Sequence, residues 1–103
     1  MIEKELLDRL AKTAYNLEFM VRDHQGIEAD DLLEMHALLQ ECMSKWKKKE
    51  EVPKRAVHIL WPMAFSMFCN ASGYQKDVKA EIEAESFKLI EMLEDIFHCE
   101  EPE

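Results

Sequence analysis

The stretch AVHILWPMAFSMFC, residues 56–69, decides the fold, because it is apolar on almost every side. Only His58 and Ser66 within it are plainly polar. A helix that is hydrophobic all round has to be covered by neighbouring elements. We therefore predict that this segment forms the third helix of the protein and is its most buried one. Pro62 lies in its interior, where a proline removes a backbone donor, so the helix is predicted to be kinked or split there.

Three other segments have the periodicity of amphipathic helices and provide partners for the central one. Apolar residues recur three and four positions apart in each of them, and only two glycines and three prolines interrupt the 103 residues. A strand over residues 56–61 is the alternative for the central stretch, but no second strand pattern exists to pair with it. We predict an all-α fold, a compact bundle of four helices at about 2–22, 28–48, 53–70 and 75–98. Residues 1–103 then form a single helical domain that ends in a short acidic tail, 99–103.

The predicted helix ends depend on short breaks in the apolar pattern. Gly26 is expected to take the left-handed conformation that ends the first helix. Pro53 marks the start of the third helix, and the cluster NASG at residues 70–73 marks its end. The apolar stripe of the fourth helix is predicted to consist of Val78, Ile82, Phe87, Ile90, Leu93 and Phe97.

The charge of the chain is acidic and unevenly distributed. Twenty-two acidic residues against 13 basic ones give a formal net charge of −9. Between residues 77 and 103 there are ten acidic residues, and only Lys79 and Lys88 oppose them. Such a surface repels phosphate backbones and anionic lipid heads, so we expect no direct binding of nucleic acid and none of a membrane. A protein partner with a basic surface is attracted to it. The simpler interpretation is that the acids keep an apolar helical protein in solution.

The cysteines favour a reduced, cytoplasmic protein. Cys42, Cys69 and Cys99 are an odd number, and none of them is part of a CxxC pair. The chain does not open with the pattern of a signal peptide, and its longest apolar run is too short to span a bilayer. We therefore predict a cytoplasmic location.

The sequence contains no pattern that is typical of a catalytic, metal or cofactor site. His98 and Cys99 are adjacent and point about 100° apart on a helix, which makes them a poor chelating pair. Asp95 and His98 have the spacing of a di-iron ligand pair, but the motif occurs once and with aspartate. Cys69 and His58 are eleven residues apart on one predicted helix, too far for a nucleophile and its base. We predict that the protein is not an enzyme and has no metal and no cofactor.

The predicted function is that of a non-catalytic, acidic protein-interaction domain. We expect an inhibitor, adaptor or immunity-type protein whose fourth helix binds a basic, nucleic-acid-handling protein, because carboxylates along a helix can imitate a row of phosphates. The predicted partner-binding residues are Glu81, Glu85, Glu91, Glu94 and Asp95.

Two alternatives come from the apolar part of the chain. Methionine suits surfaces that adapt to partners, and seven methionines are many for this length. Trp61, Met63 and Met67 then form a surface for a ligand or for a homodimer, unless they fill the bundle core. The bundle would otherwise hold a small apolar ligand or a metal between its helices, using His36, His58 and the cysteines, or serve as a homodimeric structural subunit.

Overall fold

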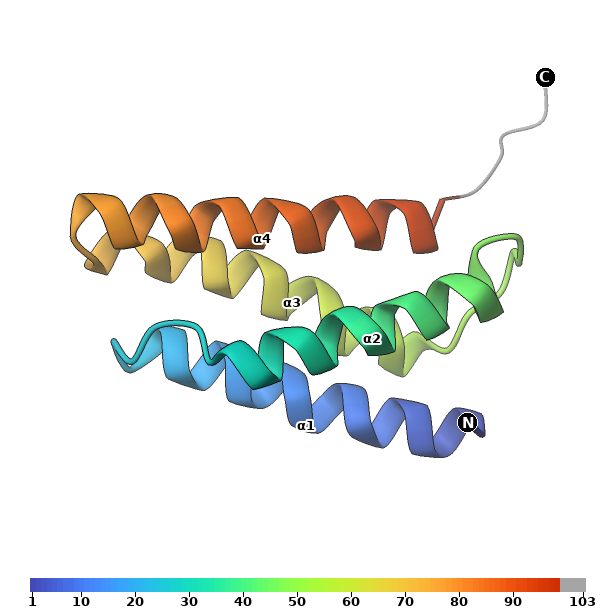
Figure 1. The fold of residues 1–103 in the computed structure, drawn as a ribbon. Coiled ribbons are helices and arrows are strands. Elements are labelled where there is room, and N and C mark those ends of the chain that lie inside the picture. The colour runs from blue at the N-terminus through green and yellow to red at the C-terminus, as the bar shows by residue number, and fades with distance from the viewer. Residues whose placement is uncertain (99–103) are drawn as a thin grey trace, which may run out of the picture.

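The computed structural model describes residues 1–98, and these form four α-helices and one 3₁₀ turn (Figure 1). The predicted all-α bundle is confirmed, and each helix lies within two residues of its predicted bounds at either end. The predicted tail, 99–103, lies outside the described residues. The elements are α1 (Glu3–Arg22), α2 (Ala29–Trp46), α3 (Lys54–Asn70), the turn η1 (Ala71–Gly73) and α4 (Lys76–Ile96).

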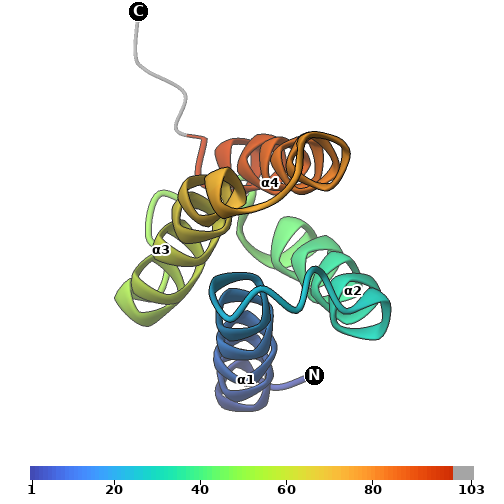
Figure 2. The same cartoon turned by 90° about the vertical axis from the view of Figure 1, so that its left-hand side faces the viewer.

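The four helices form a ring around one core (Figure 2). Each of α1 and α4 packs against both α2 and α3. The pairs α1–α2 and α3–α4 are antiparallel hairpins, whereas α1 and α3 run side by side in the same direction (Figure 1). The contact between α1 and α3 is the most extensive one in the bundle.

Helix α3 is not the enclosed centre of the bundle, so the prediction that it is the most buried helix is wrong. In a ring of four, each helix turns one face inward, and the apolar residues on the outer face of α3 stay in contact with solvent. Phe65, for example, is exposed. Helix α1 buries seven residues, whereas α3 buries five: Ala56, Leu60, Met63, Ala64 and Met67.

Pro62 does not split α3, which is one continuous helix from Lys54 to Asn70. Proline cannot donate to the carbonyl of His58, four residues earlier. Both residues lie on the exposed side of the helix, where water can hydrogen-bond this carbonyl. The missing bond is therefore tolerated within a continuous helix.

The buried face of α4 differs from the predicted apolar stripe. Phe87 and Val78 are exposed, whereas Ser86 is fully buried. The Ser86 hydroxyl donates to the carbonyl of Ile82 at 2.8 Å, so its burial leaves no unpaired donor. Counting large apolar residues missed this position because serine is polar. The residues buried along α4 are Ile82, Ser86, Leu89, Leu93 and Ile96.

Helix α1 ends at Arg22 as predicted, and Gly26 has the expected left-handed φ of 79°, but the left-handed residue that terminates the helix is His24. His24 has a left-handed φ of 59° and donates its backbone N–H to the carbonyl of Val21 at 3.2 Å. The next N–H, of Gln25, donates to the carbonyl of Met20 at 2.8 Å. These two bonds form a Schellman motif, in which a histidine takes the position that glycine usually occupies.

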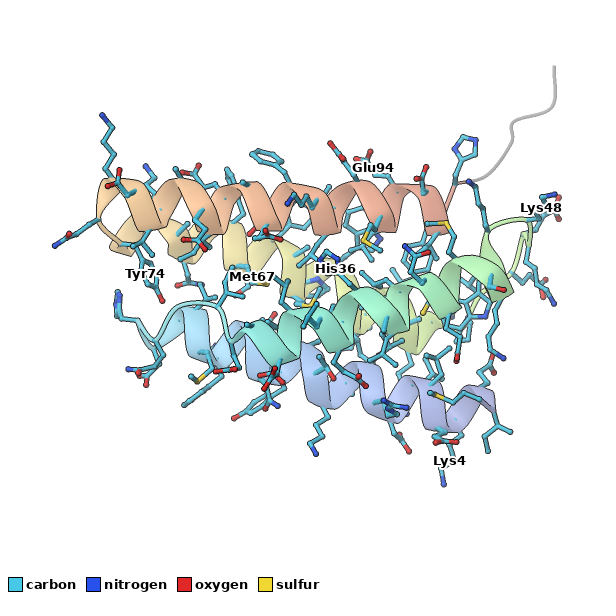
Figure 3. All side chains as sticks on the ribbon, in the orientation of Figure 1. Lys4, His36, Lys48, Met67, Tyr74 and Glu94 are labelled. Atoms are coloured by element: carbon cyan, nitrogen blue, oxygen red, sulfur yellow. The ribbon has the colours of Figure 1, made fainter. Side chains whose placement is uncertain are left out.

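Tyr74 joins the two hairpins at this end of the bundle, beside the α1–α2 turn (Figure 3). Its hydroxyl donates to the carbonyl of Val21 at 2.6 Å and accepts from the N–H of Gly26 at 3.0 Å. The rings of His24 and Tyr74 lie 5.4 Å apart. A Cβ atom at Gly73 would lie only 2.7 Å from the His24 ring, so this glycine makes room for the contact.

Candidate protein-binding surface

The five predicted partner-binding carboxylates all lie on α4, but they do not form one row. Glu91, Glu94 and Asp95 are exposed and share the outer face of the last turns of the helix, since they are three and four residues apart. Glu94 points away from the bundle (Figure 3). Successive residues turn by about 100°, which places Glu81 and Glu85 on the side of α4 that faces α2.

Glu85 is a poor candidate for partner binding. Its side chain is only 21% exposed, and its carboxylate accepts from the Lys88 ammonium at 3.3 Å. Glu81 is exposed, but it precedes Glu91 by almost three turns. The structure therefore brings three of the five predicted residues together and separates the other two from them.

An aromatic surface lies beside these carboxylates, where α3 packs on α4. Trp61 stacks on Phe65 with their ring centres 5.7 Å apart, and Phe97 lies 6.4 Å from Trp61. Phe68 and Phe87 form a second pair at 5.1 Å. Phe65 and Phe87 are each 52% exposed, which is high for phenylalanine. We call this surface the aromatic face, and its members are Val57, Trp61, Phe65, Phe68, Phe87 and Phe97.

The predicted dimer or ligand surface of Trp61, Met63 and Met67 is wrong for both methionines. Met63 and Met67 are fully buried in the core, and Figure 3 shows Met67 between the helices. Each follows an aromatic-face residue by two positions, which is about 200° around the helix and so on the opposite side. Trp61 alone lies at the surface, half-buried. The alternative that these methionines fill the core is the right one.

Sequence reasoning missed Phe65 and Phe87 as surface residues. The signal that could have found Phe65 is the excess of apolar residues in α3 over what three neighbouring helices can cover. In α4, the fully buried Ser86 precedes Phe87 by one position, so Phe87 is turned away from the core by about 100°. Predicting the exposure of either residue requires knowing how its helix is rotated about its own axis. The composition of a segment does not determine that rotation.

Charge is distributed asymmetrically around the aromatic face. On α4, Glu83 and Glu91 stand four residues before and after Phe87, and Glu94 stands seven after it, so all three lie close to the same line on the helix. Helix α3, in contrast, contains no acidic residue. Its Arg55 donates to the carboxylate of Asp8 on α1 at 2.9 Å. The aromatic face therefore has acidic residues along its α4 edge alone.

The histidines and cysteines lie apart. His36 is half-buried on α2 and His58 is exposed on α3, while Cys42 is buried and Cys69 exposed. Among residues 1–98, no three His, Cys, Asp or Glu side chains are grouped closely enough to hold a metal ion. Cys99 lies outside this range.

Burial controls the chemistry of Cys42. It raises the pKa of the thiol to about 12, and the negative charge of Glu41 acts in the same direction. The thiol therefore stays protonated at neutral pH, and in this form it is a weak nucleophile and a weak metal ligand.

Two hollows lined by described residues have mainly polar and charged walls. One of about 560 Å³ lies at the α2–α3 connection, and its lining includes Lys45, Lys49, Glu3 and Glu51. Another of about 350 Å³ lies between α1 and α2 and is also lined by charges of both signs. A small apolar ligand prefers a mainly apolar pocket, so neither hollow favours the ligand-binding alternative.

Comparison with protein-family models, with curated proteins and with solved structures finds no match to this chain. None of the helices formed by residues 1–98 has the length and the apolar content that crossing a bilayer requires. Function is therefore inferred from the surface itself.

Proposed function

We propose that the protein is a non-catalytic interaction domain that binds a basic surface of another protein through the outer face of α4. The observation that carries this proposal is the group formed by Glu91, Glu94 and Asp95, which is exposed and lies next to the exposed ring of Phe87. Lys88, the nearest cation on the helix, interacts with Glu85 instead. The three carboxylates are thus available to lysine and arginine side chains of a partner.

The partner class that fits this surface is a nucleic-acid-handling protein. Its phosphate-binding residues are basic, and acidic residues three and four positions apart on a helix have Cβ atoms about 5–6 Å from one another, which places their carboxylates in a row. The net charge of −9 attracts such a protein over a distance and speeds association at low salt. A domain with this surface acts as an inhibitor, an adaptor or an immunity-type protein.

The proposal is tested by capturing partners from the source cell or its host with the tagged protein, at low and high salt, followed by mass spectrometry. The test variant is Glu91→Gln/Glu94→Gln/Asp95→Asn. A control variant, Asp23→Asn/Glu50→Gln/Glu51→Gln, removes three exposed carboxylates elsewhere, so both variants change the net charge from −9 to −6.

We expect a basic partner that is lost at high salt and lost in the test variant, but retained by the control. Equal loss in both variants would show that net charge matters and that the α4 group does not. Absence of a partner at either salt concentration would contradict the proposed function.

A further inference from the structure

We infer that the partner presents an amphipathic helix, which lies along the aromatic face and places its basic residues against α4. This inference rests on the proposed function for its charged part and adds the element that occupies the surface. It also explains the exposed aromatic rings, which the proposed function leaves unused.

The aromatic face is larger than scattered exposed apolar residues. Single exposed residues, such as Ile2 and Leu33 here, are normal in a folded protein. On the aromatic face, by contrast, Phe65 stacks on Trp61 and Phe87 packs against Phe68, and Phe65 and Phe68 are neighbours three residues apart on α3, so the rings gather on one surface of two helices. Contiguous apolar surfaces of this kind mark sites of interaction.

The shape of this surface fits a helix. Helices α3 and α4 pack against each other and run antiparallel (Figure 1), and the ring pairs Trp61–Phe97 and Phe68–Phe87 bridge them. Val57 and Phe68 are eleven residues apart on α3, which corresponds to about 16 Å along the helix axis. A partner helix of three turns or more, with apolar residues three and four positions apart, covers this length.

The charge asymmetry selects the chemistry of that helix. Glu83, Glu91 and Glu94 follow the α4 edge, whereas α3 has no acidic residue and its two charged residues, Lys54 and Arg55, are basic. A bound helix is therefore stabilised by lysine or arginine residues that border its apolar stripe on the α4 side. An anionic membrane is repelled by these carboxylates, and a second copy of the chain would bring another net charge of −9 to the same surface.

Designed peptides test this inference. The first peptide, of about 18 residues or five turns, has leucines three and four positions apart and lysines bordering the leucine stripe. Its isomer has the same composition, but its lysines lie opposite the leucines. Binding is measured by calorimetry and by the fluorescence of Trp61. Because Trp46 also emits, Trp61→Phe serves as the control, in which the remaining Trp46 fluorescence should not change on binding.

We expect the first peptide to bind at least about tenfold more tightly than its isomer at low salt, with a smaller difference at high salt. Phe65→Ser and Phe87→Ser should each weaken binding at least about tenfold, as buried aromatic anchors do. The matched controls are Tyr15→Ser and Phe19→Ser, because these rings form an exposed stacked pair on α1. They should leave binding unchanged, and circular dichroism checks that each variant is folded.

The outcomes separate this inference from the proposed function. If Glu91→Gln/Glu94→Gln/Asp95→Asn abolishes capture of a basic protein while Phe65→Ser and Phe87→Ser have no effect, the helix on the aromatic face is wrong and the proposed function stands. Equal binding of the two peptides, or no binding of either, overturns the inference. A dimer of about twice 12.2 kDa that Phe65→Ser converts to a monomer also overturns it, because the aromatic face then belongs to a second copy.

Discussion

Tyr74 links the two hairpins through its hydroxyl group, so removing one oxygen atom removes this contact. Its hydroxyl is hydrogen-bonded to the backbone of Val21 and of Gly26. In Tyr74→Phe the carbonyl and the N–H are left without this partner in a partly buried place, so we expect the free energy of unfolding to fall by about 1–3 kcal/mol. Urea denaturation followed by circular dichroism measures the change. Tyr15→Phe, at an exposed tyrosine, should change stability by less than about 0.5 kcal/mol. Equal effects of the two substitutions would contradict the role of the Tyr74 hydroxyl.

Cys42 makes stability depend on pH in the alkaline range. Its pKa in the folded state is about 12, compared with 9.0 for an ordinary thiol. As the pH rises, the unfolded chain therefore loses the thiol proton before the folded protein does. The contribution of Cys42 to stability is complete below pH 9 and declines as the pH rises toward 12. In this window we expect Cys42 to contribute a decrease of up to about 1.4 kcal/mol per pH unit.

The measurement is the free energy of unfolding at about pH 8 and about pH 10 for the original protein and for Cys42→Ala. All other titratable groups are common to both proteins, so the difference between the two isolates the thiol. Parallel pH curves for the two proteins would show that Cys42 ionises equally in the folded and the unfolded state.

At the scale of the helices, Pro62 weakens α3 without shaping the core. Its side chain is exposed, and the helix continues on both sides of it. Pro62→Ala restores a backbone donor for the carbonyl of His58, so we expect the protein to gain at least about 1 kcal/mol of stability, with about 3 kcal/mol as the upper bound. Thermal unfolding checks this, with Pro53→Ala before the helix as the control, where no gain is expected. A loss of stability in Pro62→Ala would mean that the proline sets a bend on which packing depends.

The start of α4 lacks a capping side chain. Gln75 stands at the N-cap and makes no side-chain hydrogen bond there, whereas Glu28 caps α2 by accepting from the N–H of Asp30. We expect Gln75→Asp to stabilise the protein by about 0.5–1 kcal/mol, because aspartate accepts from the free N–H groups of the first turn. Gln75→Asn separates the two contributions, since it keeps the cap without the charge that favours the positive end of the helix. Chemical denaturation measures the stability of both variants, and a gain in neither of them would contradict the predicted cap.

At the scale of the whole molecule, the net charge of −9 opposes folding. Salt screens this repulsion, so we expect the melting temperature to rise between low ionic strength and about 0.15 M, where the Debye length is about 8 Å. The exposed pairs Arg9–Glu34 and Arg55–Asp8 weaken under the same change, but such surface pairs are worth little. Differential scanning calorimetry measures the slope. Glu91→Gln/Glu94→Gln/Asp95→Asn should show a smaller slope, and a melting temperature that falls with salt would contradict the expectation.

The sequence predicts the helices well and their arrangement poorly, for a physical reason. Periodicity and helix-breaking residues are local, so the bounds of the four helices are correct to within two residues. The ring order depends on contacts between residues far apart in the chain. A helix that is apolar on all sides, such as α3, also gives no indication of which side faces inward.

The candidate surface could likewise be predicted only in part. Residue type and position identify Glu91, Glu94 and Asp95, because three acids within two turns of a helix are visible in the sequence. The separation of Glu81 and Glu85 from them, and the exposure of Phe65 and Phe87, depend on the rotation of α3 and α4 about their axes. That rotation is decided by the packing of the whole core, which includes a serine at a position where periodicity expects none.

The ring order divides the chain into two contiguous halves, the hairpins α1–α2 and α3–α4, which only the connection at residues 47–53 joins covalently. Every contact between the halves can also form between halves of two different molecules. The fold is therefore open to domain swapping, with the lysine-rich connection as the hinge. Shortening this connection should favour an intertwined dimer in which each core is assembled from two chains, while lengthening it should favour the monomer.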